Sequence, residues 1–175
     1  MDFVGFRKIP RLSRDIVITE KLDGTNAQIY IPEDLDPAKV RIGSRNRWIH
    51  LDDDNYGFAK WVYDNLEELM GLGKGHHFGE WWGQGIQRNY GLKEKRFSLF
   101  NSSLLEIPSC CSKVPILYVG AFDTNEINKC LEELANNGSY AAPGFMKPEG
   151  VCIYHTASGS YFKKTIVDDN KPKGA

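Results

Sequence analysis

The chain has 175 residues, of which 22 are lysine or arginine and 23 are aspartate or glutamate, giving a formal net charge of −1. This length predicts a single domain over residues 1–175 that can bury a substantial core. A charge so close to zero argues against a uniformly basic nucleic-acid-binding protein, although local basic clusters can still bind phosphates on one face. The basic clusters lie at Arg7–Arg14, Arg41–Arg47, Arg88–Arg96 and Lys163-Lys164.

The four cysteines form no CxxC pair, and the adjacent Cys110 and Cys111 lack the spacing of zinc ligands. The first residues do not resemble a signal peptide, and the longest apolar stretch, residues 116–122, is too short to span a bilayer. We therefore expect a soluble monomer in a reducing, cytoplasmic setting.

Apolar alternation predicts two strands within residues 16–31, joined through the Asp23-Gly24 turn, with Ala27, Ile29 and Ile31 facing inward. Other short runs of apolar and aromatic residues predict further strands. These lie at residues 40–44, 78–82, 97–100, 116–122, 150–154 and 161–166.

Two segments have the apolar spacing of amphipathic helices. The first covers residues 56–70, and the second follows Asp123, which forms a predicted capping box with Glu126 and is followed by Gly138 beyond the helix end. Because strands outnumber helices and rarely alternate with them, the predicted class is α+β with mostly antiparallel sheets and flanking helices. The polar tail, residues 168–175, is expected to be flexible.

Lys21 carries the most chemical information in the chain. It ends a short apolar strand and directly precedes the Asp23-Gly24 break, a position where an amine faces a cleft rather than bulk solvent. A deprotonated lysine in such a cleft is a nucleophile. Lysines before Asp-Gly turns are also common solvated residues, so the position alone leaves both interpretations open.

Other polar groups stand at strand ends among core-like neighbours, namely Arg45, Glu80, Glu149, Lys163 and Lys164. A carboxylate at such an end can hold a metal-bound water or a sugar hydroxyl, and nearby lysines can neutralise phosphate oxygens. Taken singly, each group is better explained as a rim carboxylate or part of a solvated sheet edge. Their combination is more specific than any of them alone.

These groups occur in a fixed order of short segments: Lys21-Leu22-Asp23-Gly24, Ser44-Arg45, Phe78-Gly79-Glu80, Phe97-Ser98-Leu99-Phe100, Glu149-Gly150-Val151 and Phe162-Lys163-Lys164. The series resembles the motifs of the covalent nucleotidyltransferases, the superfamily of ATP-dependent ligases and mRNA capping enzymes. The run from Glu20 to Asn26 and the stretch from Phe78 to Asn101 look most like the ATP-dependent RNA ligases. The resemblance covers residues 17–166 and implies a nucleotidyltransferase (ATP-grasp-like ligase adenylation) domain without an OB-fold.

The resemblance implies a reaction in which Lys21 attacks the α-phosphorus of ATP, expels pyrophosphate and retains AMP as a lysyl-adenylate. AMP would then pass to an RNA 5′-phosphate, and a 3′-hydroxyl would displace it to form a phosphodiester. The implied cofactors are ATP and Mg²⁺ or Mn²⁺, and the implied partner is RNA with 5′-phosphate and 3′-hydroxyl ends.

The resemblance also implies residue roles: Phe100 stacks on adenine, Glu80 binds the ribose, and Glu149 positions a metal-bound water. The implied catalytic residues are Lys21, Glu149, Lys163 and Lys164. The implied ATP- and AMP-binding residues are Glu20, Lys21, Asn26, Arg45, Glu80, Phe100, Glu149, Lys163 and Lys164. The implied nucleic-acid-binding residues are Asn26, Arg88, Lys93 and Lys95, with Asn26 on the 5′-phosphate of the acceptor strand.

Three features depart from the family pattern. Lys163 and Lys164 are adjacent, whereas the family separates its two lysines by one residue, so which of them contacts the α-phosphate stays open. Asn101 stands where many relatives have aspartate. Most relatives continue into an OB-fold or a helical domain after the last motif, so this chain is expected to be a minimal ligase or the catalytic domain of a longer protein.

Two other interpretations remain. One is a DNA ligase core or a GTP-using capping enzyme, which incubation with labelled ATP, GTP or NAD would distinguish. The other is a catalytically silent module that keeps the fold and binds nucleotides or nucleic-acid ends.

Overall fold

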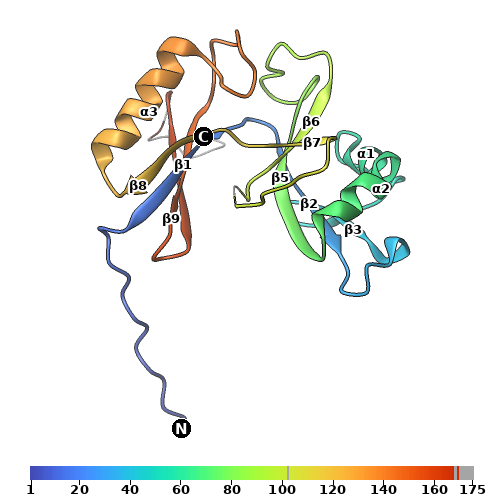
Figure 1. The fold of residues 1–175 in the computed structure, drawn as a ribbon, viewed down its shortest axis with the longest axis horizontal. Coiled ribbons are helices and arrows are strands. Elements are labelled where there is room, and N and C mark those ends of the chain that lie inside the picture. Colours follow the sequence, from blue (N-terminus) through green and yellow to red (C-terminus); the bar gives the residue numbers. More distant parts are fainter. Residues whose placement is uncertain (102, 168, 170–175) are drawn as a thin grey trace.

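The computed structural model describes residues 1–101, 103–167 and 169 and contains two β-sheets with helices on their outer sides (Figure 1). The strands are β1 Asp15–Lys21, β2 Thr25–Ile31, β3 Arg41–Ser44, β4 Trp48–Ile49, β5 Gly75–Gly83, β6 Lys95–Leu99, β7 Cys111–Lys113, β8 Ile116–Ala121, β9 Gly150–His155 and β10 Ser160–Thr165. The helices are α1 Phe58–Asp64, α2 Leu66–Leu69 and α3 Thr124–Asn137, with short 3-10 turns η1 Pro37–Lys39 and η2 Met70–Leu72.

Sheet A is the smaller sheet and has four antiparallel strands in the order β10-β9-β1-β8. Its outer face packs against α3, where Ile16 and Ile18 of β1 share a core with Cys130 and Leu134 of the helix. Because successive side chains of a strand point to opposite faces, Lys21 lies on the inner face, away from α3.

Sheet B has six strands in the order β4-β3-β2-β5-β6-β7, and among the described strands only β6 and β7 pair in parallel. Its outer face packs against α1 and α2 through a core that includes Ile29, Phe58, Val62, Trp81 and Phe97. The opposite face of β2 and β5 therefore does not take part in this core.

The chain crosses from one sheet to the other at two places, at residues 22–24 between β1 and β2 and at residues 114–115 between β7 and β8. A third apolar cluster packs around these crossings and contains Leu22, Trp82, Tyr90, Val114 and Ala142. The crossings and this cluster hold the two sheets side by side, as Figure 1 shows.

The α+β class and the mostly antiparallel sheets are confirmed. The inward alternation of Ala27, Ile29 and Ile31 is also confirmed, since all three are buried. However, the two strands joined through Asp23-Gly24 do not pair with each other, because the chain changes sheets there. The two-residue strand β4 and the three-residue strand β7 were not predicted, since their sequences are too short to show a period.

The predicted helix over residues 56–70 is divided at Asn65, which has φ −118° and ψ 16°. The Asn65 side chain donates to the carbonyl of Trp61 at 2.7 Å, so it competes with the helical hydrogen bonds of its own turn. The second helix begins and ends as predicted, with Asp123 accepting from the Asn125 N–H and Gly138 at φ 82°.

No helix in the described part of the chain is long and apolar enough to cross a membrane. The tail over residues 168–175, which we expect to be flexible, lies outside the described residues except for Asp169.

Gly24 is required by a close approach between the first crossing and β5. A Cβ atom at this position would lie 2.4 Å from the Trp81 carbonyl oxygen and 2.7 Å from Trp82 Cβ. We predict that Gly24→Ala lowers the free energy of unfolding by about 1–3 kcal/mol through overpacking. Urea denaturation followed by tryptophan fluorescence measures this loss.

Gly71→Ala is the matched control, because no atom lies within 4 Å of the Cβ position at Gly71. Its free energy of unfolding should stay close to that of the wild type. Equal destabilisation by the two substitutions would contradict the steric explanation.

Candidate active site

Lys21 ends β1 on the inner face of sheet A, and its Nζ lies 2.5 Å from Oε2 of Glu149. The two side chains retain only 15% and 6% of their exposure, so this ion pair is largely removed from water. Gly150 follows Glu149 and is the Cα partner of Lys21 in the β1–β9 ladder. The sheet register therefore sets the position of Glu149 relative to the amine.

Gly150 allows the start of β9 to lie close against the end of the antiparallel strand β10. A Cβ atom on Gly150 would lie 2.2 Å from the backbone oxygen of Lys164, so a larger residue would displace the strands. The glycine after Glu149 thus keeps the carboxylate at the base of the site.

Glu80 approaches the same cluster from sheet B. Its Oε1 accepts a hydrogen bond of 3.0 Å from the N–H of Gly24, in the crossing that follows Lys21. The pKa of Glu80 is raised to about 7, chiefly by burial and to a smaller extent by the nearby carboxylates of Glu149 and Asp23, against the opposing effects of the Gly24 N–H and the Lys21 charge. Glu80 is consequently poised between its neutral and charged forms near pH 7.

Asp23 is held between the two halves of the molecule. Its Oδ2 lies 2.9 Å from Nε of Arg88, and its N–H donates to the Tyr90 hydroxyl at 2.8 Å. Arg88 also donates to the carbonyl of Lys147, in the segment that precedes Glu149. The loop after β5 is therefore tied both to the first crossing and to the segment before β9.

The two adjacent lysines of β10 face opposite ways. Lys163 pairs with Cys152 of β9 on the inner face, and the charges of Lys21, Glu80, Glu149 and Lys163 all act on the Cys152 thiol. Burial raises the pKa of that thiol, which therefore remains a neutral neighbour of the cluster. Lys164 lies on the outer face.

On the outer face, Lys164 pairs with the buried Val151 and donates to Asn128 of α3 at 2.7 Å. The structure thus brings Lys163 to the candidate site and places Lys164 against the helix.

Asn26, Arg45 and Phe100 lie around the cluster. Asn26 is the Cα partner of Glu80, and Arg45 directly follows Ser44, the partner of Ala27, so both lie at the same end of sheet B as Glu80. Phe100 is half-buried and packs against the cluster around the crossings, beside Leu22.

Besides Lys164, three further sequence-predicted residues lie outside the cluster. The buried Glu20 carboxylate accepts from the Ser139 hydroxyl at 2.6 Å and from the N–H groups of Tyr140 and Ala141. Lys95 donates to the Tyr56 carbonyl and shares the outer face of β6 with Phe97. Lys93 is exposed in the loop before β6.

Residues 14–166 match a sequence model of the RNA ligase family. The chain belongs to the RNA ligase family. No curated protein sequence matches it.

Several solved structures of Naegleria gruberi RNA ligase have the same fold as this chain. A ligand-free variant has a TM-score of 0.62 and 21% identity over 87% of this chain and 50% of that chain. A variant with AMP and Mn has a TM-score of 0.64 and 20% identity over 88% and 50%. A variant with ATP and Mn has a TM-score of 0.60 and 21% identity over 86% and 48%. The chain therefore spans about half the length of these ligases.

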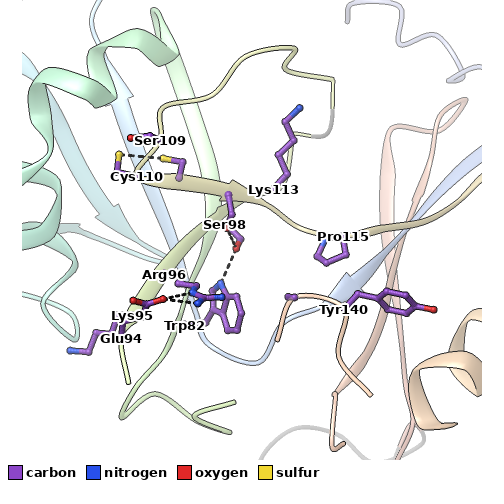
Figure 2. A pocket seen from close by; sticks show the side chains of 13 residues that line it. Trp82, Glu94, Lys95, Arg96, Ser98, Ser109, Cys110, Lys113, Pro115 and Tyr140 are labelled. Carbon is purple, nitrogen blue, oxygen red and sulfur yellow. Dashed lines mark hydrogen bonds and ion pairs between the residues drawn. The ribbon is translucent and has the colours of Figure 1, made fainter. Parts of the chain in front are cut away.

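A separate pocket of about 470 Å³ lies between β6, β7 and the segment after α3 in this RNA ligase fold (Figure 2). Trp82 Nε1 donates to Ser98 Oγ at 2.8 Å, and Ser98 Oγ lies 2.7 Å from Ser112 Oγ. The lining includes Tyr140 and Ala141 but none of the Lys21 cluster. We therefore take Lys21 and the carboxylates beside it, rather than this pocket, as the candidate active site.

Sequence reasoning assigned no role to the side chains of Asp23, Tyr90 and Cys152. Burial raises the pKa of the Tyr90 hydroxyl above its usual range, which keeps it a neutral hydrogen-bonding group next to Asp23. Asp23 could have been recognised from the sequence, because it is part of the segment Lys21-Leu22-Asp23-Gly24. Tyr90 and Cys152 reach the site through loop and sheet geometry that no local pattern contains.

Within residues 1–101, 103–167 and 169, no three or more His, Cys, Asp or Glu side chains form a group that could hold a metal ion. Mg²⁺ commonly uses one or two carboxylates together with substrate phosphates and water. The carboxylate of Glu149, beside Lys21, fits that mode of binding.

The raised pKa of Glu80 predicts that the stability of the folded chain depends on pH. Because burial raises its pKa from 4.5 to about 7 in the folded chain, the folded state binds more protons than the unfolded state within that interval. The contribution of Glu80 to the free energy of unfolding therefore falls as the pH rises from 4.5 to about 7. Replacing Glu80 with glutamine should reduce the loss of stability between pH 5 and pH 8 by about 1–3 kcal/mol.

Urea denaturation at the two pH values measures this difference. The control is Glu132→Gln, which removes an exposed carboxylate from α3. An identical pH dependence in the wild type and Glu80→Gln would show that Glu80 does not titrate in this interval.

Proposed function

We propose that this chain is the nucleotidyltransferase domain of an ATP-dependent RNA ligase and that Lys21 is its nucleophile. The observation that carries the proposal is the position of Lys21 Nζ, 2.5 Å from the Glu149 carboxylate on the inner face between the two sheets. Membership of the RNA ligase family over residues 14–166 supports the reaction class. The Naegleria ligase structures with AMP or ATP and Mn support the nucleotide and a divalent cation as ligands.

In the first step, the neutral amine of Lys21 attacks the α-phosphorus of ATP after losing a proton. A nitrogen–phosphorus bond forms as the bond to the β-phosphate oxygen breaks, and pyrophosphate leaves. Glu149 lies next to the amine and orients it toward the phosphorus. The product is AMP bound covalently to Lys21.

The surrounding residues bind the nucleotide. The half-buried Phe100 ring stacks on adenine, and Glu80 accepts a hydrogen bond from the ribose. Lys163 contacts the α-phosphate from the inner face of β10, and Arg45 binds the ribose or a phosphate. A bound divalent cation near Glu149 would neutralise phosphate charge as pyrophosphate departs.

In the following steps, an RNA 5′-phosphate oxygen attacks the adenylate phosphorus, which releases the Lys21 amine and forms an RNA–adenylate. A 3′-hydroxyl then attacks the 5′-phosphorus, a phosphodiester forms, and AMP leaves. Asn26 lies opposite Glu80 and is placed to hold the 5′-phosphate, and Arg88 is placed to contact the RNA backbone after separating from Asp23.

Lys21→Ala should abolish covalent nucleotide uptake because it removes the attacking nitrogen. Intact-mass spectrometry of the 175-residue chain with ATP and Mg²⁺ should show the mass of one added AMP for the wild type and no addition for the variant. GTP and NAD in separate reactions identify the nucleotide. AMP addition to Lys21→Ala would show that another residue is the nucleophile.

Lys21→Arg is the control for the ion pair. Arginine keeps a positive charge beside Glu149 but is too weak a nucleophile to form the adenylate. Loss of AMP uptake in both variants, with unchanged circular dichroism, separates the missing nucleophile from an unpaired buried carboxylate.

The two lysines of β10 should differ sharply in their effect on adenylylation. Lys163→Ala should lower the rate by at least about tenfold because it removes a cation that faces the phosphates. Lys164→Ala should stay near the wild-type rate, since its amine contacts Asn128 on the other face. Quench-flow measurement of AMP uptake tests this order, and a larger loss for Lys164→Ala would contradict the facial assignment.

A further inference from the structure

The inner face of sheet B carries a row of exposed aromatic rings that the proposed chemistry does not use. We define the aromatic face as Tyr30 of β2, Trp48 of β4, and His76 and Phe78 of β5. Phe78 retains 47% and Trp48 retains 39% of its exposure, and His76 is also exposed. The core of sheet B lies on the opposite side of these strands, so these rings are not needed to cover it.

The rings of the aromatic face are arranged around His76. The His76 and Phe78 rings are stacked, with centroids 5.8 Å apart and an angle of 9° between their planes. Trp48 stacks toward His76 at 6.4 Å and 26°, and Tyr30 contacts it at 4.7 Å. His76 is further held by Gln28 at 3.2 Å. These contacts fix the rings as a platform.

The platform continues directly into the candidate active site. Phe78 and Glu80 lie two residues apart on β5 and so point to the same face, about 7 Å apart along the strand. On β2, Asn26 is the partner of Glu80 and Tyr30 is the partner of His76. A chain that leaves the Lys21 cluster along these strands therefore passes over the rings.

Positive charge accompanies the platform. The Arg41 guanidinium carbon lies 6.0 Å from the centroid of the Trp48 ring, and Arg45 is exposed in the turn between β3 and β4. Aromatic rings that stack on bases, with cations for the phosphates beside them, are the usual means of holding single-stranded nucleic acid. A sheet surface with such rings commonly stacks two or three unpaired bases.

We propose that the aromatic face binds unpaired RNA bases next to the end that is joined, which makes single-stranded RNA the substrate class of the proposed ligase. This inference rests on the proposed function for the identity of the neighbouring site. The ligand is an RNA segment whose bases stack on Phe78, His76 and Trp48 while Arg41 contacts its phosphates. A paired duplex does not offer its base faces for such stacking.

The test measures binding of a short fluorescein-labelled, 5′-phosphorylated single-stranded RNA to the 175-residue chain by anisotropy without ATP. Phe78→Leu keeps apolar volume but removes the ring, and His76→Ala removes the central ring. Each variant should weaken binding about tenfold, whereas Phe78→Trp should bind like the wild type. Affinity for a blunt RNA duplex should stay the same in all variants.

Tyr63→Leu is the matched control, because Tyr63 is 44% exposed on α1, on the helical side of sheet B. It should leave single-strand affinity unchanged. Single-strand affinity that is unaffected by Phe78→Leu and His76→Ala, or an equal loss for the duplex, would overturn the proposal. Loss of binding in Tyr63→Leu to the same degree would overturn it too.

Tryptophan fluorescence gives a second measurement that a merely structural role would not affect. Bases stacked near the exposed Trp48 should quench its emission. The quenching should disappear in Trp48→Phe, since Trp81 and Trp82 are buried and the half-buried Trp61 of α1 packs against the core on the helical side of sheet B. Equal quenching in wild type and Trp48→Phe would count against stacking on this face.

AMP uptake, measured separately by intact mass, distinguishes this proposal from the proposed function. All variants of the aromatic face should still gain one AMP. A wild-type chain that binds single-stranded RNA through Phe78 but takes up no nucleotide would refute the ligase reaction and leave the binding surface standing.

Discussion

The site depends on one constraint, which is that the chain leaves sheet A immediately after Lys21 and enters sheet B within three residues. Lys21, the proposed nucleophile, therefore stands at the boundary between the two sheets. The β1–β9 ladder places Glu149 against its amine, and the crossing itself presents the Gly24 N–H to Glu80. Carboxylates from both sheets thus converge on one amine because a single short segment joins the sheets.

Holding the sheets together requires more than the covalent connection. The apolar cluster around Leu22, Trp82 and Val114 fills the space at the crossings, and Arg88 joins Asp23 to the segment before β9. Glu20 adds a second tie, since its buried carboxylate holds the backbone at residues 140–141. Burial raises the pKa of Glu20, while its three hydrogen bonds oppose that rise. Neighbouring residues of β1 thus have different roles. Lys21 points into the candidate active site, and Glu20 holds the backbone after α3 in place.

Much of the site could be predicted from the sequence because its residues lie in short segments of defined order. Strand alternation also gave the buried face of β2 correctly. Adjacent residues such as Lys163 and Lys164 could not be separated, because only the pairing with Cys152 and Val151 shows which of them faces inward. Lys95 was predicted to bind nucleic acid because its charge is visible in the sequence. Its contact with the Tyr56 carbonyl is visible only in the structure.

In sheet B, the alternation of side chains along a strand gives the two faces of the sheet different residues. Along β5, Gly79 and Trp81 are buried toward α1 and α2, whereas His76, Phe78 and Glu80 lie on the other face. The residues of the inner face change from aromatic to acidic as the strand approaches the crossing. A strand that keeps its core on one face can thus carry the proposed base-stacking surface and the proposed nucleotide-binding carboxylate in sequence on the other. The strand fixes the spacing between them, so the same backbone would set where a bound RNA segment lies relative to Lys21.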